Sequence, residues 1–167
     1  MLSSNIIHYK LIDQIYSFFT VEMVYLWLNL GVLPFWFVLV VFPKSQICSV
    51  FMASIFPIFI LSIAYAYLLY VAHINSYDFL QNFSLYLGFD EISNLFENQS
   101  FLILFWAHFL AMNLFCGGWI VKDSQMFAMN KFIVSLPLII TYLIGPIGLT
   151  IYWLIRVFYA KRISLYD

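Results

Sequence analysis

The sequence predicts an all-α integral membrane protein: an up-down bundle of four transmembrane helices, preceded by an N-terminal interfacial amphipathic helix. Of the 167 residues, 65 % are hydrophobic and 9 % are charged, whereas soluble domains carry about 25 % charged residues. A chain with so few polar residues cannot cover an apolar core with a water-facing surface. Four charge-poor runs also reach the ~20 residues that a membrane-spanning helix needs. They cover about residues 20–42, 47–72, 100–121 and 132–156.

The segments that flank this membrane domain, residues 20–156, differ from it in character. Residues 157–167 form a basic tail, and residues 1–19 form an N-terminal segment whose residues 5–19 alternate polar and apolar side chains. The spacing in residues 1–19 is typical of an amphipathic helix that lies at the membrane surface. Its apolar side consists of Ile7, Leu11, Ile15 and Phe18. The net charge of −1 gives no reason to expect a nucleic-acid partner.

Two prolines and a short turn shape the first pair of predicted spans. Pro34 lies near the middle of the first span, where a proline removes a backbone hydrogen bond and bends the helix. Residues 42–46 form a turn so short that the second span must return antiparallel beside the first. Pro57 lies inside the second span. The same span contains small residues that permit close helix approach, namely Ser54, Ser62, Ala64 and Ala66.

Residues 73–99 form a long connection that contains no lysine or arginine. Within it, Ile92, Leu95 and Phe96 follow helical spacing after Asp90, a residue type that favours the N-cap of a helix. The pattern predicts a short interfacial helix that Asp90 caps.

The last two predicted spans contain glycines at positions that suit close packing. Lys122 and Asp123 follow the third span, and we expect them to mark its end at the membrane surface. In the fourth span, Gly145 and Gly148 share one helical face with Thr141, which suits a tight helix–helix seam. Pro146, between the two glycines, predicts a kink there.

An even number of spans would place both termini on one side of the membrane. The terminal side would then hold Lys10, Arg156, Lys161 and Arg162, against Lys44, Lys122 and Lys131 on the other side. The side richer in lysine and arginine usually faces the cytoplasm. The two counts are close, but the cluster of basic residues at the C-terminus favours termini on the cytoplasmic side. We therefore expect a multi-pass protein of the cytoplasmic or inner membrane.

His108 is the titratable side chain that lies deepest in a predicted span, roughly 12 Å along the helix from its start. Ionisable groups at such depth are costly and therefore mark candidate sites. Histidine also changes its charge closest to neutral pH, which suits proton transfer. The alternative is a neutral histidine that is hydrogen-bonded to another helix. Asn113 points about 140° away from His108 around the helix, so we expect two separate interior contacts; an interhelical hydrogen bond would also explain Asn113.

Glu22, Asn29 and Trp36 repeat at seven-residue spacing and line one stripe of the first span. This stripe either packs against the bundle or contributes to a site. Glu22 and Asp123 are the other candidate proton carriers beside His108.

We expect no metal and no cofactor. His73 and His108 differ too much in membrane depth to serve as paired ligands of a haem. No cluster of metal-ligating residues appears at a known spacing. Cys48 and Cys116 do not form a CxxC pair and are interpreted as buried small hydrophobic residues.

Five blocks of sequence suggest a family. They are "NLGVLPFW" (Asn29–Trp36), "FPKS" (Phe42–Ser45), "YAYLLY" (Tyr65–Tyr70), "WAHFLAMNLFCGGWIVKD" (Trp106–Asp123) and "GPIGL" (Gly145–Leu149). Together they resemble small four-helix membrane proteins typified by plant neoxanthin synthase, the abscisic-acid-deficient type, over about residues 25–156. For the plant members the resemblance implies conversion of violaxanthin to neoxanthin, in which a carotenoid epoxide opens to an allene. Such a reaction needs an acid near the epoxide oxygen and a base for an allylic proton.

The chain departs from the family pattern in the third span. Family members commonly have an acid where this chain has Asn113, an arginine near Gly118, and glycine where it has Ser124. The positions that fit the motif are Trp106, His108, Leu114, Phe115 and Asp123.

Two classes of function stay open. The resemblance implies a protein that binds or acts on a carotenoid or other isoprenoid in the bilayer. The sparse ionisable groups favour a non-enzymatic protein that binds lipid or packs into a larger membrane complex. The candidate catalytic residues are His108, Glu22 and Asp123, and the candidate lipid- or polyene-facing residues are Asn29, Trp36, Trp106, Asn113 and Trp119.

Overall fold

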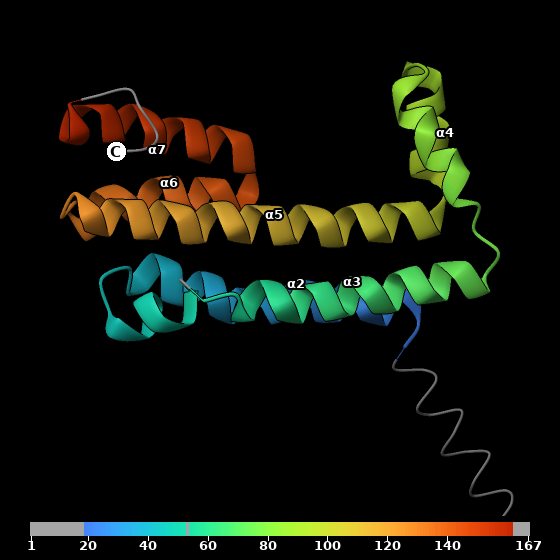
Figure 1. The fold of residues 1–167 in the computed structure, drawn as a ribbon, viewed down its shortest axis with the longest axis horizontal. Helices are drawn as coiled ribbons and strands as arrows, with labels where there is room; N and C mark the ends of the chain where they lie inside the picture. Colours follow the sequence, from blue (N-terminus) through green and yellow to red (C-terminus); the bar gives the residue numbers. More distant parts are fainter. Residues whose placement is uncertain (1–18, 53, 162–167) are drawn as a thin grey trace, which may run out of the picture.

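The computed structural model describes residues 19–52 and 54–161, and its regular elements within these ranges are helices (Figure 1). The amphipathic helix predicted for residues 1–19 falls, but for Phe19, outside the described residues. So does the end of the basic tail. The elements are α2 (Val21–Val41), η1 (Cys48–Met52), α3 (Phe56–Ile74), η2 (Phe79–Tyr86), α4 (Phe89–Glu97), α5 (Gln99–Met126), α6 (Lys131–Leu143) and α7 (Gly145–Ala160).

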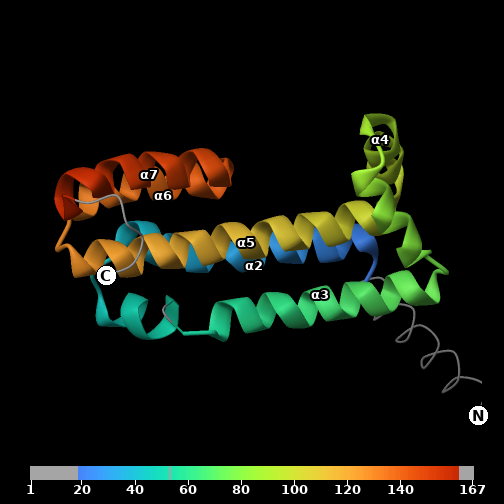
Figure 2. The same cartoon turned by 45° about the horizontal axis from the view of Figure 1, so that its top comes forward.

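Three of these helices are long and apolar enough to cross a membrane, namely α2, α3 and α5. They lie side by side along the long axis of the molecule (Figures 1 and 2). The all-α class is therefore confirmed, and the first three predicted spans correspond to helices that could cross a membrane. Pro34 lies inside α2, as expected, and Thr20 caps the helix by accepting a hydrogen bond from the Met23 N–H at 3.4 Å.

The second predicted span, residues 47–72, is interrupted. A π-helical turn, η1, comes first, and α3 begins at Phe56. Pro57 therefore lies in the first turn of α3 and not in a helix interior. A proline is tolerated there because the N–H groups of the first turn have no hydrogen-bond partner within the helix.

The connection between α3 and α5 contains the predicted short helix, which is α4. Gly88 and not Asp90 occupies its N-cap, and Asp90 lies in its first turn. α4 stands across the end of the bundle (Figure 1). Its Phe96 ring packs against Phe101 and Phe105 of α5 at centroid distances of 5.2 and 4.8 Å, which fixes α4 over the first turns of that helix.

α5 is longer than predicted. It has 28 residues and continues to Met126, so Lys122 and Asp123 lie within the helix and do not mark its end. Asn98 caps its start by accepting hydrogen bonds from the N–H groups of Ser100 and Phe101.

The predicted fourth span, residues 132–156, is wrong as a single helix. The chain breaks at Ile144 into α6 and α7, which run antiparallel as a helical hairpin (Figure 2). With 13 and 16 residues, the two helices are about 20 and 24 Å long, less than the ~30 Å of a bilayer core. Pro146 lies in the first turn of α7, at the place where a kink was predicted.

Glycines make this hairpin tight. A Cβ added to Gly148 would overlap the backbone of Thr141, and one added to Gly145 would overlap the side-chain oxygen of Asn113. The close seam predicted from Thr141, Gly145 and Gly148 therefore exists, but it runs within the hairpin and onto α5. Ser135 also ties α6 to α2, because its hydroxyl donates to the Val40 carbonyl at 2.8 Å.

The hairpin changes the topology. α2 begins at the end of the bundle where α5 begins, and α7 ends at the opposite end, beside the turn between α5 and α6 (Figure 1). The described chain thus starts and finishes at opposite ends, unlike the predicted same-side termini. Lysines gather where α7 ends, at Lys44, Lys122, Lys131 and Lys161. Under the positive-inside rule, we expect this end to face the cytoplasm.

Cysteine accessibility in intact membranes checks this topology. Gln46→Cys and Lys161→Cys are expected to react with a membrane-impermeant thiol reagent from the cytoplasmic side, and Asn94→Cys from the opposite side. Burial raises the pKa of the native Cys48 thiol to about 11, so this residue will contribute little background at neutral pH.

A four-span bundle makes a different forecast for the same variants. It would place Lys161→Cys on the same side as Asn94→Cys. Labelling of that pair from one side would contradict the hairpin.

Candidate functional site

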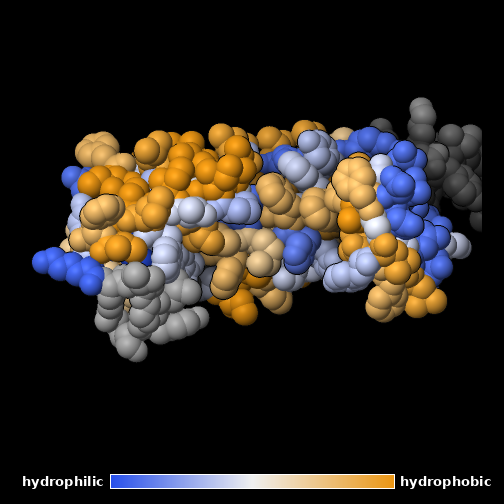
Figure 3. All heavy atoms as spheres, turned by 90° about the horizontal axis from the view of Figure 1, so that it is seen from above, coloured by the Kyte–Doolittle hydropathy of each residue, from blue (hydrophilic) through white to orange (hydrophobic). Residues whose placement is uncertain are grey.

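The short hairpin leaves the first half of α5 uncovered on one side. Between α4 and the hairpin tip, the side chains of Leu102, Phe105 and Met112 are 46 %, 41 % and 48 % exposed. His108 is also exposed, and Phe109 is half-buried. We call these five residues the open face of α5. In Figure 3 hydrophilic residues interrupt the hydrophobic surface in the middle of the molecule.

Helix geometry places His108 on the side where α7 packs. His108 and Trp119 are eleven residues apart and so point within about 20° of each other. Trp119 contacts Tyr152 of α7, with ring centroids 5.7 Å apart. α7 begins too late to cover His108, which therefore faces outward and makes no hydrogen bond to another described residue. The interior contact predicted for His108 is absent from the described part of the chain.

Asn113 marks the inner end of the open face. Its side chain is 6 % exposed and lies against Gly145 at the hairpin tip. Its amide nitrogen has no hydrogen-bond partner among the described residues. Because unsatisfied polar groups cost several kcal/mol in a bilayer core, this donor is suited to an acceptor from outside the described residues.

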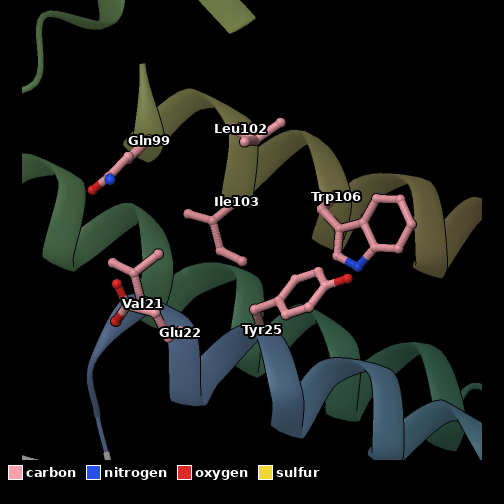
Figure 4. A pocket seen from close by; sticks show the side chains of 7 residues that line it. All are labelled: Val21, Glu22, Tyr25, Gln99, Leu102, Ile103 and Trp106. Atoms are coloured by element: carbon pink, nitrogen blue, oxygen red, sulfur yellow. The ribbon is translucent and has the colours of Figure 1, made fainter. Parts of the chain in front are cut away.

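A pocket of about 320 Å³ adjoins the open face at its outer end, between α2 and α5 (Figure 4). Tyr25 and Trp106 face each other across it, with ring centroids 5.9 Å apart. Polar groups lie toward the membrane surface, at Glu22 and Gln99. Leu102 belongs to both the pocket and the open face, so the two are continuous.

The stripe on α2 divides into two environments. Asn29 accepts a hydrogen bond from the Trp106 indole N–H at 3.3 Å and donates to the Tyr25 carbonyl at 2.7 Å, so it fixes the pocket wall. Trp36 is 4 % exposed and packs on Gly117 and on the ring of Tyr142. This part of the stripe is a packing contact between α2, α5 and α6.

Asp123 lies at the other end of α5, in a closed cluster with α7. Its carboxylate accepts from the Arg156 Nε–H at 2.8 Å and from the Tyr152 hydroxyl at 2.6 Å. Asp123 and Arg156 are 3 % and 1 % exposed, and the Arg156 guanidinium also lies 5.0 Å from the Phe127 ring centroid. Such closure supports a structural role for Asp123.

The three candidate proton carriers therefore do not meet. Glu22 lies in the pocket, and His108 lies about 14 Å further along α5 than Gln99 at the pocket mouth. Asp123 is fifteen residues beyond His108 and is paired. Within the described ranges no group of three metal-ligating side chains exists. His108 is the polar group of the open face in mid-membrane, and Asn113 is buried at its inner end.

Sequence comparison identifies the family. A family model described as ABA DEFICIENT 4-like matches residues 23–152, most of the chain. The chain belongs to the ABA DEFICIENT 4-like family. The match contains α3, α4, α5 and α6, nearly all of α2 and the first half of α7, so the open face and the tip of the hairpin lie within the family region.

One relative is Protein ABA DEFICIENT 4, chloroplastic, from Arabidopsis thaliana. It is 32 % identical over 97 residues, which make up 56 % of this chain and 44 % of the relative. The chain therefore matches less than half the length of this family member. No solved structure matches the chain.

The Asp123–Arg156 pair generates a stability prediction. Asp123→Leu leaves the Arg156 charge buried without its partner, which should lower the free energy of unfolding by about 3–5 kcal/mol. Thermal unfolding of the detergent-solubilised protein measures this loss.

The double variant Asp123→Leu/Arg156→Met is the control. It removes both charges and keeps apolar volume, so most of the stability should return. A double variant as unstable as Asp123→Leu would show that the pair itself does not hold the hairpin.

Proposed function

We propose that the protein binds a carotenoid or related isoprenoid from the bilayer against the open face of α5, and acts on it there. The observation that carries this proposal is the open face of α5, which has an exposed histidine, His108, and a buried amide without a described partner, Asn113, at its inner end. Membership of the ABA DEFICIENT 4-like family supports the ligand class.

The dimensions and lining of this face suit a long apolar ligand. From Gln99 to Asn113 the distance along α5 is about 21 Å. Aromatic rings line it, and Trp106 stacks on Phe109 at 5.4 Å. Flat conjugated chains pack well against such rings. The site opens sideways to the membrane, so a lipid-soluble ligand reaches it without crossing water.

His108 and Asn113 supply the polar chemistry. The Asn113 amide donates a hydrogen bond to an oxygen of the ligand, and His108 exchanges a proton with the ligand. For an epoxide-to-allene isomerisation, His108 would take the proton from carbon while the C–O bond breaks. The same proton would then return to the alkoxide, so the atoms balance without a second reagent.

Glu22 is the candidate second proton carrier at the membrane surface. It lies in the pocket beside Gln99, where protons exchange with water more readily than in the bilayer core. Asp123 is less suited to this role because Arg156 and Tyr152 already occupy its carboxylate.

A non-enzymatic role in a larger membrane complex is the second candidate. It is favoured by large exposed side chains on the connection that carries η2 and α4. Phe83, Tyr86, Leu87 and Phe89 are 68 %, 85 %, 73 % and 83 % exposed. Such a patch at the membrane surface could pack against another membrane protein.

His108→Gln tests the catalytic proposal. Glutamine can still donate and accept hydrogen bonds but does not exchange protons at neutral pH. We expect conversion of the carotenoid to fall about 10²-fold or more, with pigment binding retained. His73→Gln is the matched control, because His73 is exposed at the end of α3, away from the open face.

Full activity in a folded His108→Gln protein would remove His108 as the proton carrier. Equal losses in His108→Gln and His73→Gln would show that the effect is not specific to the open face.

Gentle extraction followed by absorption spectroscopy separates the two candidate functions. A ligand-binding protein is expected to copurify with a polyene spectrum that Asn113→Leu diminishes. Stoichiometric protein partners without pigment, unchanged by Asn113→Leu, would favour the non-enzymatic role.

A further inference from the structure

A second groove lies further along α5 than the open face, where η1 and α3 meet this helix. It has a volume of about 440 Å³. Its lining is apolar over most of its length, and Lys122 is the charged residue in it. The other lining residues are Ser54, Ile55, Pro57, Ile58, Leu114, Phe115, Gly118 and Trp119.

The groove follows from the interruption of the second predicted span. Because α3 begins only at Phe56, no continuous helix covers this part of α5. Gly118 has no side chain to fill the space, while Phe115 is 58 % exposed. The result is an apolar channel that runs about 12 Å along α5 from Lys122 to Leu114.

The charge at the mouth is basic and uncompensated. Lys122 is exposed, and it forms no ion pair with a described residue. The neighbouring Asp123 carboxylate is already bound by Arg156 and Tyr152. The described acidic residues other than Asp123 lie toward the opposite end of the bundle, at Glu22, Asp78, Asp90, Glu91 and Glu97.

We propose that this groove binds a phospholipid with an anionic headgroup, with the phosphate at Lys122 and one acyl chain along the channel. Lys44, Lys131 and Lys161 lie at the same end of the molecule and add to the positive potential there. The cytoplasmic leaflet, which this end faces under the positive-inside rule, is the one that carries anionic lipids. The groove shares no residue with the open face, on which the proposed function rests.

Lipid-dependent thermal stability tests the proposal with the full chain in detergent. Long-chain phosphatidylglycerol at tenfold excess over its Kd should raise Tm by roughly 3–6 °C, because a ligand that binds the folded state stabilises it. Phosphatidylcholine with the same chains should raise Tm by less than a third of that shift. Short-chain phosphatidylglycerol and free glycerol phosphate should have little effect, since neither fills the channel.

Lys122→Gln should abolish the difference between the two long-chain lipids. Lys131→Gln is the matched control, because it removes the same charge at the same end but lies outside the groove. Three outcomes would overturn the proposal: equal stabilisation of the wild type by both lipids, an equal loss in the two variants, or a full shift with glycerol phosphate alone.

Discussion

The ion pair between Asp123 and Arg156 determines where the C-terminal hairpin lies, and the open face follows from it. In a medium without water a carboxylate and a guanidinium that lose each other remain as buried charges, so their pairing strongly restricts the register of α7 on α5. The Tyr152 hydroxyl adds a second donor to the same carboxylate. With α7 fixed in this way, its first residue, Gly145, reaches only as far as Asn113, the middle of α5. The outer half of α5 stays uncovered as a result.

At the hairpin tip, few backbone N–H and C=O groups lack a hydrogen-bond partner, which suits an apolar environment. The Ile144 N–H bonds to the Ile140 carbonyl at 2.7 Å, and the Gly148 N–H bonds to the Ile144 carbonyl at 3.2 Å. Pro146 has no N–H to satisfy. Irregular backbone at membrane depth is tolerated where it is buried in protein or lines a cavity. The hairpin tip is buried against Asn113. It also borders the open face, where the proposed ligand would bind.

The three long helices could be predicted from the sequence because their apolar runs are continuous and long. The prediction failed for the last apolar run, which is equally continuous but forms two helices. Residues 132–156 read as one span because nothing in hydropathy distinguishes a kink at Pro146 from a reversal. Arg156 within that run was the available signal, since a buried arginine needs a partner. Its partner lies 33 residues away, beyond the reach of helical periodicity. The 140° divergence of His108 and Asn113, by contrast, was predicted from spacing and is confirmed, because one faces outward and the other is buried.

Asn113 and Gly118 act at two different places on α5. Residues 113 and 118 are five apart, so they point about 140° from each other and cannot form an ion pair within the helix. Asn113 faces the hairpin tip, whereas Gly118 faces the groove beside α3. The amide at 113 places a hydrogen-bond donor in the bilayer core without the cost of a charge. Glycine at 118 opens the groove floor, and Lys122, one turn further along, then provides the positive charge at the membrane surface.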